Sequence, residues 1–271
     1  MDKLTLSAVE QIEYYLGKDR LPNLHWQAKL PESWEIQGRK GRLFHSETIK
    51  NSTVVDPVNT EIVYRFNNLG FRADVDYTDD LKDKNIILVV GCSDTFGRLV
   101  EYENIYSSKL QKACNAYTVI NMSTPGASPD MITRFATQTI KYLQVSVKHL
   151  CLVWPPFSIR EFVSKTFKSG ITVHEREFVP YADWWDHIDW VSNNYNYQKN
   201  KILLQSICGE YKIGYHDLII NRDDTKIPYD FIPCGPFTSI GPKTHAAVAN
   251  YFYKKITNLP NLYEQLKILQ S

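Results

Sequence analysis

The sequence of 271 residues has almost no net charge and no long apolar run. Lys and Arg number 31 and Asp and Glu number 30, so the overall charge favours neither a nucleic-acid partner nor an anionic membrane surface. The longest apolar runs, 86–90 and 150–154, are far shorter than the roughly 20 residues that cross a bilayer. The first residues lack the apolar stretch of a signal peptide. We therefore expect a globular protein that uses neither nucleic acid nor a membrane as partner.

Cysteine is scarce and unpaired. The five cysteines are odd in number, and no two have the CxxC spacing of a structural zinc site. A disulfide framework is not expected, and the predicted location is a reducing one, either the cytoplasm or a particle such as a virion that is assembled inside a cell. No residue pattern predicts a cofactor or a metal ion.

A regular alternation of strand and helix patterns begins near residue 82. Apolar strand patterns occur at 85–90, 118–122, 147–154 and 211–218, and helix patterns occur at 103–115, after Ser128, at 195–210 and after Gly241. Strands that are apolar throughout are typical of a parallel sheet covered on both faces. The predicted fold is therefore a three-layer, doubly wound α/β sheet of four or five parallel strands, with ligand sites at the carboxyl ends of the strands.

Residues 1–80 have a different pattern. A helix is predicted at 8–16, and the residues after it are interrupted by proline and glycine and contain short alternating segments such as 61–66. We predict a β-rich N-terminal extension over 1–80 and an α/β domain over 81–271.

An aromatic-rich insertion is predicted at about 165–194 of the α/β domain. Its residues Trp184, Trp185 and Trp190 are a candidate surface for a protein partner or for sugar rings, or they pack the insertion onto the domain. Asp183 and His187 are spaced to share a helical face, but one such pair has too few ligands to predict a metal site.

The strongest local signal is the segment 90–97, Val-Gly-Cys-Ser-Asp-Thr-Phe-Gly, directly after the first predicted strand. Ser93 is predicted to lie at the carboxyl edge of the sheet, where a nucleophilic hydroxyl has backbone N–H groups nearby for an oxyanion. The alternative is that Ser93 and Thr95 only satisfy backbone groups of the turn.

Residues 91–97 resemble the first block, G-D-S-x-T-x-G, of the SGNH (GDSL-like) hydrolases. Three further segments agree in order: 64–72 resembles the R-x-N-x-x-G-F-R lead-in of bacterial and phage members, 121–128 the second block, and 240–245 the end of the last block. The resemblance implies a flavodoxin-like hydrolase fold. It also implies that Ser93 is the nucleophile and donates one oxyanion N–H, and that Gly126 donates a second.

The third and last blocks depart from the family pattern. The Asn that family members carry after the third strand is missing from 153–161. The positions of the family's Asp and His are occupied by Pro236 and Ser239, neither of which accepts a proton near neutral pH. His245, about one helical turn further on, is the nearest substitute for the base.

The neighbours of Ser93 are also unusual. Cys92 replaces the Asp of the first block, and in an extended segment its side chain is expected to point away from that of Ser93 and to be buried. Asp94 is expected to accept a hydrogen bond in the turn or to repel an anionic substrate.

Two functions are consistent with these residues. The first is a degenerate or weakly active SGNH-like protein with a binding or structural role, of which a virion-associated protein is one form, and the missing base favours it. The alternative is a serine esterase or acetylhydrolase that acts through Ser93 on small esters or O-acetylated glycans. In both, the expected ligand is an acylated small molecule or glycan, and the catalytic candidates are Ser93, Gly126 and His245.

Overall fold

The computed structural model describes the parallel sheet, its helices and several smaller strands. The described residues are 33–36, 39–45, 51–56, 60–65, 67, 71–75, 79–98, 100–155, 159–163, 170–174, 190–220, 227, 230–234 and 237–257. The helix predicted at 8–16 and the candidate partner residues Trp184 and Trp185 lie outside these residues.

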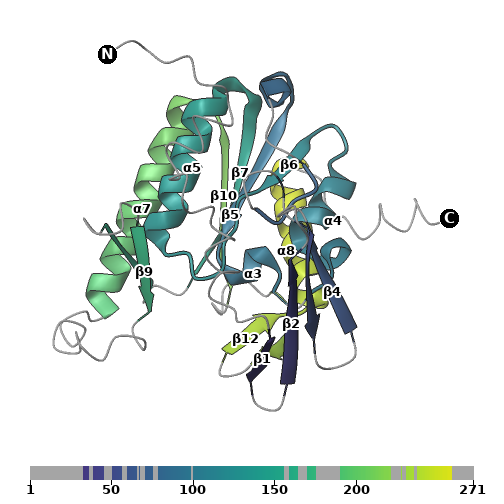
Figure 1. The fold of residues 1–271 in the computed structure, drawn as a ribbon. Helices are drawn as coiled ribbons and strands as arrows, with labels where there is room; N and C mark the ends of the chain where they lie inside the picture. Colours follow the sequence, from purple (N-terminus) through teal and green to yellow (C-terminus); the bar gives the residue numbers. More distant parts are fainter. Residues whose placement is uncertain are drawn as a thin grey trace, which may run out of the picture.

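Four parallel strands form the central sheet (Figure 1). They are β5 (Ile86–Gly91), β6 (Thr118–Asn121), β7 (Val147–Trp154) and β10 (Gly214–Ile219), in the order β10-β7-β5-β6. Counted along the chain this is the 2-1-3-4 order of flavodoxin-like sheets, so the predicted doubly wound α/β fold is confirmed. The winding direction changes between β5 and β7. Ligands of such sheets bind at this switch point, beside the end of β5.

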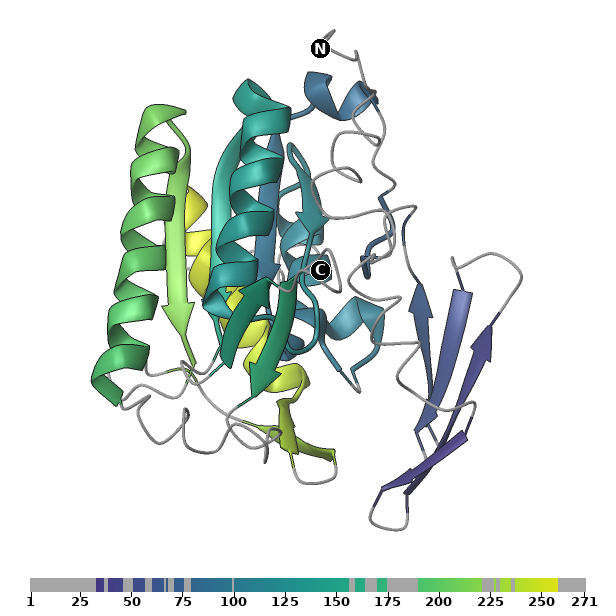
Figure 2. The ribbon, with the colours of Figure 1, turned by 60° about the vertical axis from the view of Figure 1, so that its left-hand side comes forward.

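Helices cover both faces of the sheet (Figures 1 and 2). One face carries α5 (Pro129–Leu143) and α7 (Trp190–Glu210), and the other carries α4 (Tyr106–Ala113) and α8 (Pro242–Thr257). Alternate residues of β5 enter the two cores: Leu88 and Val90 join the core with α5, whereas Ile87 and Val89 join the core with α4 and α8. All four side chains are fully buried, which explains why the strand is apolar throughout.

Smaller antiparallel units surround this sheet (Figure 2). The N-terminal region forms a four-stranded sheet of β1 (Ser33–Ile36), β2 (Arg39–His45), β3 (Asn51–Asp56) and β4 (Thr60–Arg65). The other pairs are β8 (Ile159–Val163) with β9 (Gly170–His174) and β11 (Phe231–Cys234) with β12 (Phe237–Ile240). Further short helices are η1 (Asp79–Asp83), α3 (Ser93–Phe96), η2 (Tyr102–Asn104) and η3 (Gln144–Ser146). The extension is therefore β-rich as expected, and the division of the chain at residue 80 stays a prediction.

Three element boundaries differ from those predicted. The helix expected over 103–115 is divided, because Ile105 has an extended backbone between η2 and α4. The strand expected from residue 211 begins at Gly214, because the turn after α7 extends through Lys212, whose φ is +56°. Helix α7 begins at Trp190, five residues before the predicted start.

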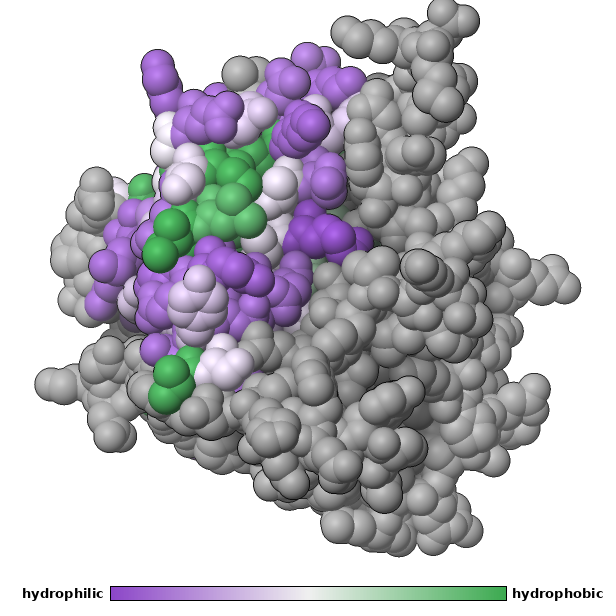
Figure 3. All heavy atoms as spheres, turned by 90° about the vertical axis from the view of Figure 1, so that its left-hand side faces the viewer, coloured by the Kyte–Doolittle hydropathy of each residue, from purple (hydrophilic) through white to green (hydrophobic). Residues whose placement is uncertain are grey.

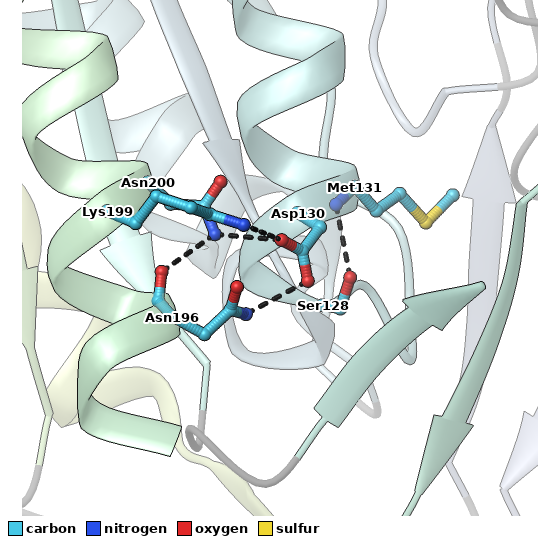
Figure 4. Close-up of polar contacts among 6 residues, drawn as sticks. All are labelled: Ser128, Asp130, Met131, Asn196, Lys199 and Asn200. Carbon is cyan, nitrogen blue, oxygen red and sulfur yellow. Dashed lines mark hydrogen bonds and ion pairs between the residues drawn. The ribbon is translucent and has the colours of Figure 1, made fainter. Parts of the chain in front are cut away.

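The start of α5 follows its predicted capping pattern (Figure 4). Ser128 is the N-cap, and its Oγ accepts the Met131 N–H at 3.1 Å. Pro129 occupies the first helical position, where a missing N–H costs nothing. This cap fixes the end of the loop that carries Gly126.

The carboxylate of Asp130 joins α5 to α7 (Figure 4). It accepts hydrogen bonds from Asn196 Nδ2 at 2.9 Å and Asn200 Nδ2 at 3.0 Å, and Lys199 Nζ lies 3.2 Å away. Burial alone would raise the pKa of Asp130, but the hydrogen bonds from Asn200, Asn196 and Lys199 hold it below its usual range. The contact between the two helices therefore contains a charged, hydrogen-bonded centre in addition to apolar packing.

The outer face of α7 carries large apolar side chains (Figure 3). They are Val191, Tyr195, Ile202 and Leu203, all of which are exposed. The helix has 21 residues, yet neither it nor any other helix in the described part of the chain is long and apolar enough to span a membrane.

Candidate active site

Helix α3, which begins at Ser93, follows β5 at the switch point of the sheet (Figure 1). Cys92 is the N-cap of α3 and Ser93 is its first residue, with a partly exposed side chain. Its place at the carboxyl end of the first parallel strand is as predicted. Its role as a nucleophile stays a prediction.

Two glycines shape the turn around Ser93. A Cβ atom on Gly91 would lie 1.9 Å from Thr95 Oγ1, so only glycine lets α3 fold back this closely onto the strand. Gly97 ends α3 with a φ of +73°, and its N–H donates to the Ser93 carbonyl at 3.0 Å. The Thr95 hydroxyl is itself held by the hydroxyl of Tyr106 at 3.2 Å. These contacts fix the position of α3 against the sheet.

Gly126 belongs to a tight turn beside the same strand end. The Ala127 N–H donates to the Thr124 carbonyl at 3.2 Å, and Gly126 has a φ of +79°. With Pro125 in the second position this is the pattern of a type II turn, which requires glycine at the third. The Thr124 N–H donates to the Gly91 carbonyl at 3.2 Å, so the turn is attached directly to the end of β5. The loops of Ser93 and Gly126 are therefore neighbours, as the resemblance implied.

The Cys92 side chain does not point away from Ser93. Its Sγ lies 3.7 Å from Ser93 Oγ, so the expected orientation was wrong. The alternation of an extended strand stops at Cys92 because the next residue begins a helix. The expected burial is correct, since the side chain is only 6% exposed. Burial raises the pKa of the Cys92 thiol, and the Ser93 side chain and the N–H groups of Ser93 and Gly126 offset this only in part, so the thiol stays protonated at neutral pH.

Asp94 faces the hairpin that precedes α8. It belongs to α3, which packs against β12, the second strand of this hairpin. Burial raises the pKa of Asp94 to about 6, and the Ile240 N–H opposes the increase. Its carboxylate is close enough to Cys92 to raise the pKa of the thiol as well. Asp94 is thus an ionisable group beside Ser93 that titrates near neutral pH, which sequence reasoning did not identify.

His245 is buried beneath α4. Its Nδ1 accepts the backbone N–H of Tyr106 at 3.2 Å, and its ring lies against the Tyr106 ring with centroids 6.0 Å apart. The side chain is fully buried, and its Nε2 has no hydrogen-bond partner among the residues that the structure describes. Burial, and then the positive charge of Arg72, lower the pKa of His245 to about 3. The imidazole is therefore neutral, and one of its nitrogens is already used. Its role as the catalytic base stays a prediction.

The last block forms a hairpin and a helix cap. Ser239 lies on β12 opposite Ile232, and Pro236 is outside the described residues. The acidic residue of this region is Asp230, whose carboxylate accepts the N–H groups of Lys243 at 2.9 Å and Thr244 at 2.7 Å. Asp230 therefore caps the N-terminus of α8, a role that sequence reasoning missed.

The end of β7, where the resemblance places an Asn, is held by a different contact. Trp154 Nε1 donates to Asp217 Oδ2 at 3.0 Å, and Lys201 Nζ lies 2.8 Å from the same oxygen. Asp217 thus holds β10, β7 and α7 together. On the opposite face of β10, His216 Nε2 lies 3.2 Å from His149 Nδ1, so His216 and Asp217 do not form a dyad.

The lead-in motif 64–72 braces the nucleophile turn. Arg72 is fully buried, and its guanidinium donates to the carbonyls of Phe96 at 3.0 Å, Gly97 at 2.5 Å and Val100 at 2.6 Å. A cation that bonds the last carbonyls of α3 stabilises the C-terminal end of this helix. Through Arg72, the motif therefore helps to hold the turn that carries Ser93.

Asn67 shapes the loop that delivers this arginine. Its Oδ1 accepts the Phe71 N–H at 2.9 Å, and its backbone N–H donates to the Phe71 carbonyl at 2.9 Å. Its Nδ2 donates to the Val75 carbonyl at 3.1 Å. The Phe71 ring then packs edge-on against Phe135 in the core. The contacts of Asn67, Phe71 and Arg72 thus fold this loop and attach it to the core.

The sequence predicts no metal site, and it places a candidate partner surface in the insertion at about 165–194. Across the described ranges, no three His, Cys, Asp or Glu side chains are grouped closely enough to hold a metal ion. Of the three candidate partner tryptophans, Trp190 is the first residue of α7.

Comparison with solved structures finds a distant likeness in fold. No family model and no curated protein matches this chain. A solved structure of a member of the lipolytic protein G-D-S-L family from Veillonella parvula is similar to it with a TM-score of 0.34 and 10% sequence identity. The likeness covers 64% of this chain and 97% of the other.

Proposed function

We propose that this chain is an SGNH-hydrolase-like protein that binds an acylated ligand at Ser93 and turns it over slowly or not at all. The ligand is a small ester or an O-acetylated glycan, whose acyl oxygen is held by backbone N–H groups. A structural role in a particle assembled inside a cell, with Trp184, Trp185 and Trp190 as the partner surface, belongs to the same proposal.

The observation that carries this proposal is the state of His245. Attack by Ser93 requires a group that takes its proton, and the residue at the family's His position is Ser239. His245 is fully buried, and its Nδ1 already accepts the backbone N–H of Tyr106. Burial also strongly disfavours the charged form of its imidazole, which lowers its pKa. A base that resists protonation to this extent is a poor acceptor for a serine proton.

Turnover of an aryl acetate by the purified protein tests the proposal. We expect a rate below about 0.01 per second, because loss of the base removes a factor of roughly 10²–10⁴ from ordinary enzyme rates. The Ser93→Ala variant is the matched control and should behave in the same way. Turnover near 1 per second or faster that disappears in the variant would refute the proposal.

Binding is tested separately with an O-acetylated monosaccharide, followed through backbone amide resonances. The proposal expects the Ser93 and Gly126 resonances to shift on titration with the acetylated sugar and to stay in place with the deacetylated one. If neither resonance moves at millimolar sugar, the acyl pocket is not a binding site.

The second candidate function is a serine esterase, and Asp94 is the observation that favours it. Its pKa of about 6 is suited to a general base at neutral pH, and it follows Ser93 directly. Side chains of successive helical residues do not face each other, so a water would have to carry the proton between them. This function requires turnover that rises with pH through about 6 and is lost in Asp94→Asn. A flat pH profile excludes it.

A further inference from the structure

One face of α7 carries exposed residues at the spacing of a coiled-coil seam. The positions 191, 195, 198, 202, 205 and 209 follow one another at alternating intervals of four and three residues, and all six are exposed. They lie on the side of the helix opposite Asn193, Asn200 and Leu204, which are buried. We call this row the α7 seam, and its members are Val191, Tyr195, Gln198, Ile202, Gln205 and Gly209.

The seam contains no charge, which is unusual for the outer face of a surface helix. Such a helix normally buries one apolar stripe and exposes charged residues on the other side. Of the ten exposed residues that the structure describes on α7, only Lys199 and Glu210 are charged. Lys199 Nζ lies 3.2 Å from Asp130, and Lys201, which is half-buried beside the seam, lies 2.8 Å from Asp217. The strip is therefore neutral, and the cations at its flanks already have carboxylate partners.

Gly209 is a further unusual member of the seam. Glycine weakens a helix relative to alanine. A Cβ atom on Gly209 would meet nothing within 4 Å among the described residues outside its own helix, and its φ is not positive. Neither the backbone nor close packing within the described chain requires glycine here. A second molecule that packs closely against the seam at this point would require it.

We propose that two copies of this chain associate through the α7 seam, with the two helices antiparallel and a two-fold axis near residue 200. Each large side chain of the seam then faces a glycine or a flexible glutamine of the other copy. The pairs are Val191 with the partner's Gly209, Tyr195 with the partner's Gln205 and Ile202 with the partner's Gln198. The amide opposite Tyr195 also offers a partner to its hydroxyl. This dimer goes beyond the proposed acyl binding and does not depend on it.

The ends of α7 favour the antiparallel arrangement over a parallel one. The helix has no acidic residue in its first turn and no basic residue in its last, so its own residues do not compensate its dipole. It ends instead with Glu210, whose negative charge is unfavourable at that end. In the antiparallel pair Glu210 lies near the first turn of the other helix, where free N–H groups favour an anion. A parallel pair would bring the two Glu210 side chains together.

The expected contact is small. A helix of 21 residues is about 30 Å long, so two such helices bury on the order of 1,000 Å² in total. This area is at the lower limit of specific interfaces. We therefore expect a weak dimer, with a dissociation constant in the micromolar range, and not an obligate one.

Sedimentation equilibrium of the full chain, from about 1 µM to 1 mM, measures this association. We expect the mass to rise toward that of a dimer. Ile202→Glu should raise the dissociation constant at least about 100-fold, because it places two unpaired charges in the contact. Leu203→Glu is the matched control, since Leu203 is also exposed and next in sequence but lies about 100° away around the helix. It should leave the dissociation constant nearly unchanged.

Three results would overturn the proposal. A chain that stays monomeric at about 1 mM does so, because a different partner must then cover the seam. Equal weakening by Ile202→Glu and Leu203→Glu does so, since it shows a general effect of added charge. A dimer that Ile202→Glu leaves intact does so, because it forms through another face. Both sites are exposed, and circular dichroism checks that both variants keep their helices.

Cross-linking tests the orientation of the two helices. A mixture of Tyr195→Cys and Gln205→Cys should form a linked dimer on oxidation with copper phenanthroline, because these positions face each other. Tyr195→Cys alone should not, since its two copies lie about 15 Å apart along the helix axis, beyond the roughly 7 Å that a disulfide spans. The unchanged protein is the control for native thiols, of which Cys92, Cys114, Cys151 and Cys208 are buried. A cross-link in Tyr195→Cys alone, or none in the mixture, overturns the antiparallel pairing.

Discussion

Acid should destabilise this protein through His245, and the size of the effect can be worked out. The buried imidazole has a pKa of about 3, against an ordinary value of 6.5. In the unfolded chain it takes up a proton as the pH falls through 6.5, whereas in the folded chain it stays neutral. The stabilising contribution is therefore complete above the ordinary pKa and decreases as the pH falls toward 3. At pH 5 the loss is about 2 kcal/mol of the free energy of unfolding.

The variant His245→Asn isolates this contribution. The Asn Oδ1 takes the place of Nδ1 and accepts the Tyr106 N–H, but the side chain has no titratable group. At pH 7.5 we expect a cost of about 1–3 kcal/mol from the lost ring packing. Between pH 7.5 and pH 5 the variant should lose about 2 kcal/mol less than the unchanged protein.

Urea denaturation of both proteins at the two pH values measures this difference. Burial, and then the nearby charges of His149 and Lys255, lower the pKa of His216 to about 4. His216 contributes equally to the acid sensitivity of both proteins, so its effect cancels in the comparison. Equal acid sensitivity of the two proteins would refute the reasoning. So would a proton resonance of the His245 ring that titrates near pH 6.5, since it would show that the imidazole is not buried and neutral.

Three further substitutions test the fold around the site. Arg72→Met should destabilise the protein by about 3 kcal/mol or more in urea denaturation, because it leaves three buried carbonyls without their donor. Arg134→Met on α5 should cost under about 1 kcal/mol, because Arg134 is half-buried and its methylene stem and contact with the Phe135 ring are largely kept by methionine. Gly91→Ala should cost about 1–3 kcal/mol, because the new methyl group meets Thr95, and Gly91→Ala combined with Thr95→Ser should cost as much, since Oγ remains. Asp130→Ala should lower stability by about 1–3 kcal/mol, because the Asn196 and Asn200 amides lose their acceptor, and thermal unfolding that matches the unchanged protein would contradict this contact.

The order of the main elements could be predicted because the sheet is simple. Strand β5 and most of β6 and β7 are buried on both faces, so they appear as short apolar runs, whereas β10 is largely half-buried. The helices between the strands have clear caps such as Ser128 with Pro129. The boundaries were less predictable where the backbone leaves its regular conformation at one residue. Ile105 and Lys212 are such positions, and neither has a side chain that marks an interruption.

The candidate site was predictable in place but not in detail. The positions of Ser93 and Gly126 follow from glycine and proline patterns that allow few turn types. The orientation of Cys92 depends on a change from strand to helix within one residue, and the alternation rule fails there. The partner of His245 is Tyr106, which is 139 positions away in the sequence, so its burial and its used nitrogen could not be predicted from its local segment.

The carboxylate between α5 and α7 also determines how these helices are aligned along their length. Apolar side chains of similar size tolerate a slide of one helix past another, whereas Asp130 accepts from amides about one turn apart on α7, at 196 and 200. A slide by one turn, about 5.4 Å, that brings Asn200 to the present place of Asn196 would put Leu204 where Asn200 now donates. That misaligned state leaves the carboxylate short of a donor. A single acidic residue thus selects one alignment of α7, and with it the placement of every residue that the helix presents to the outside.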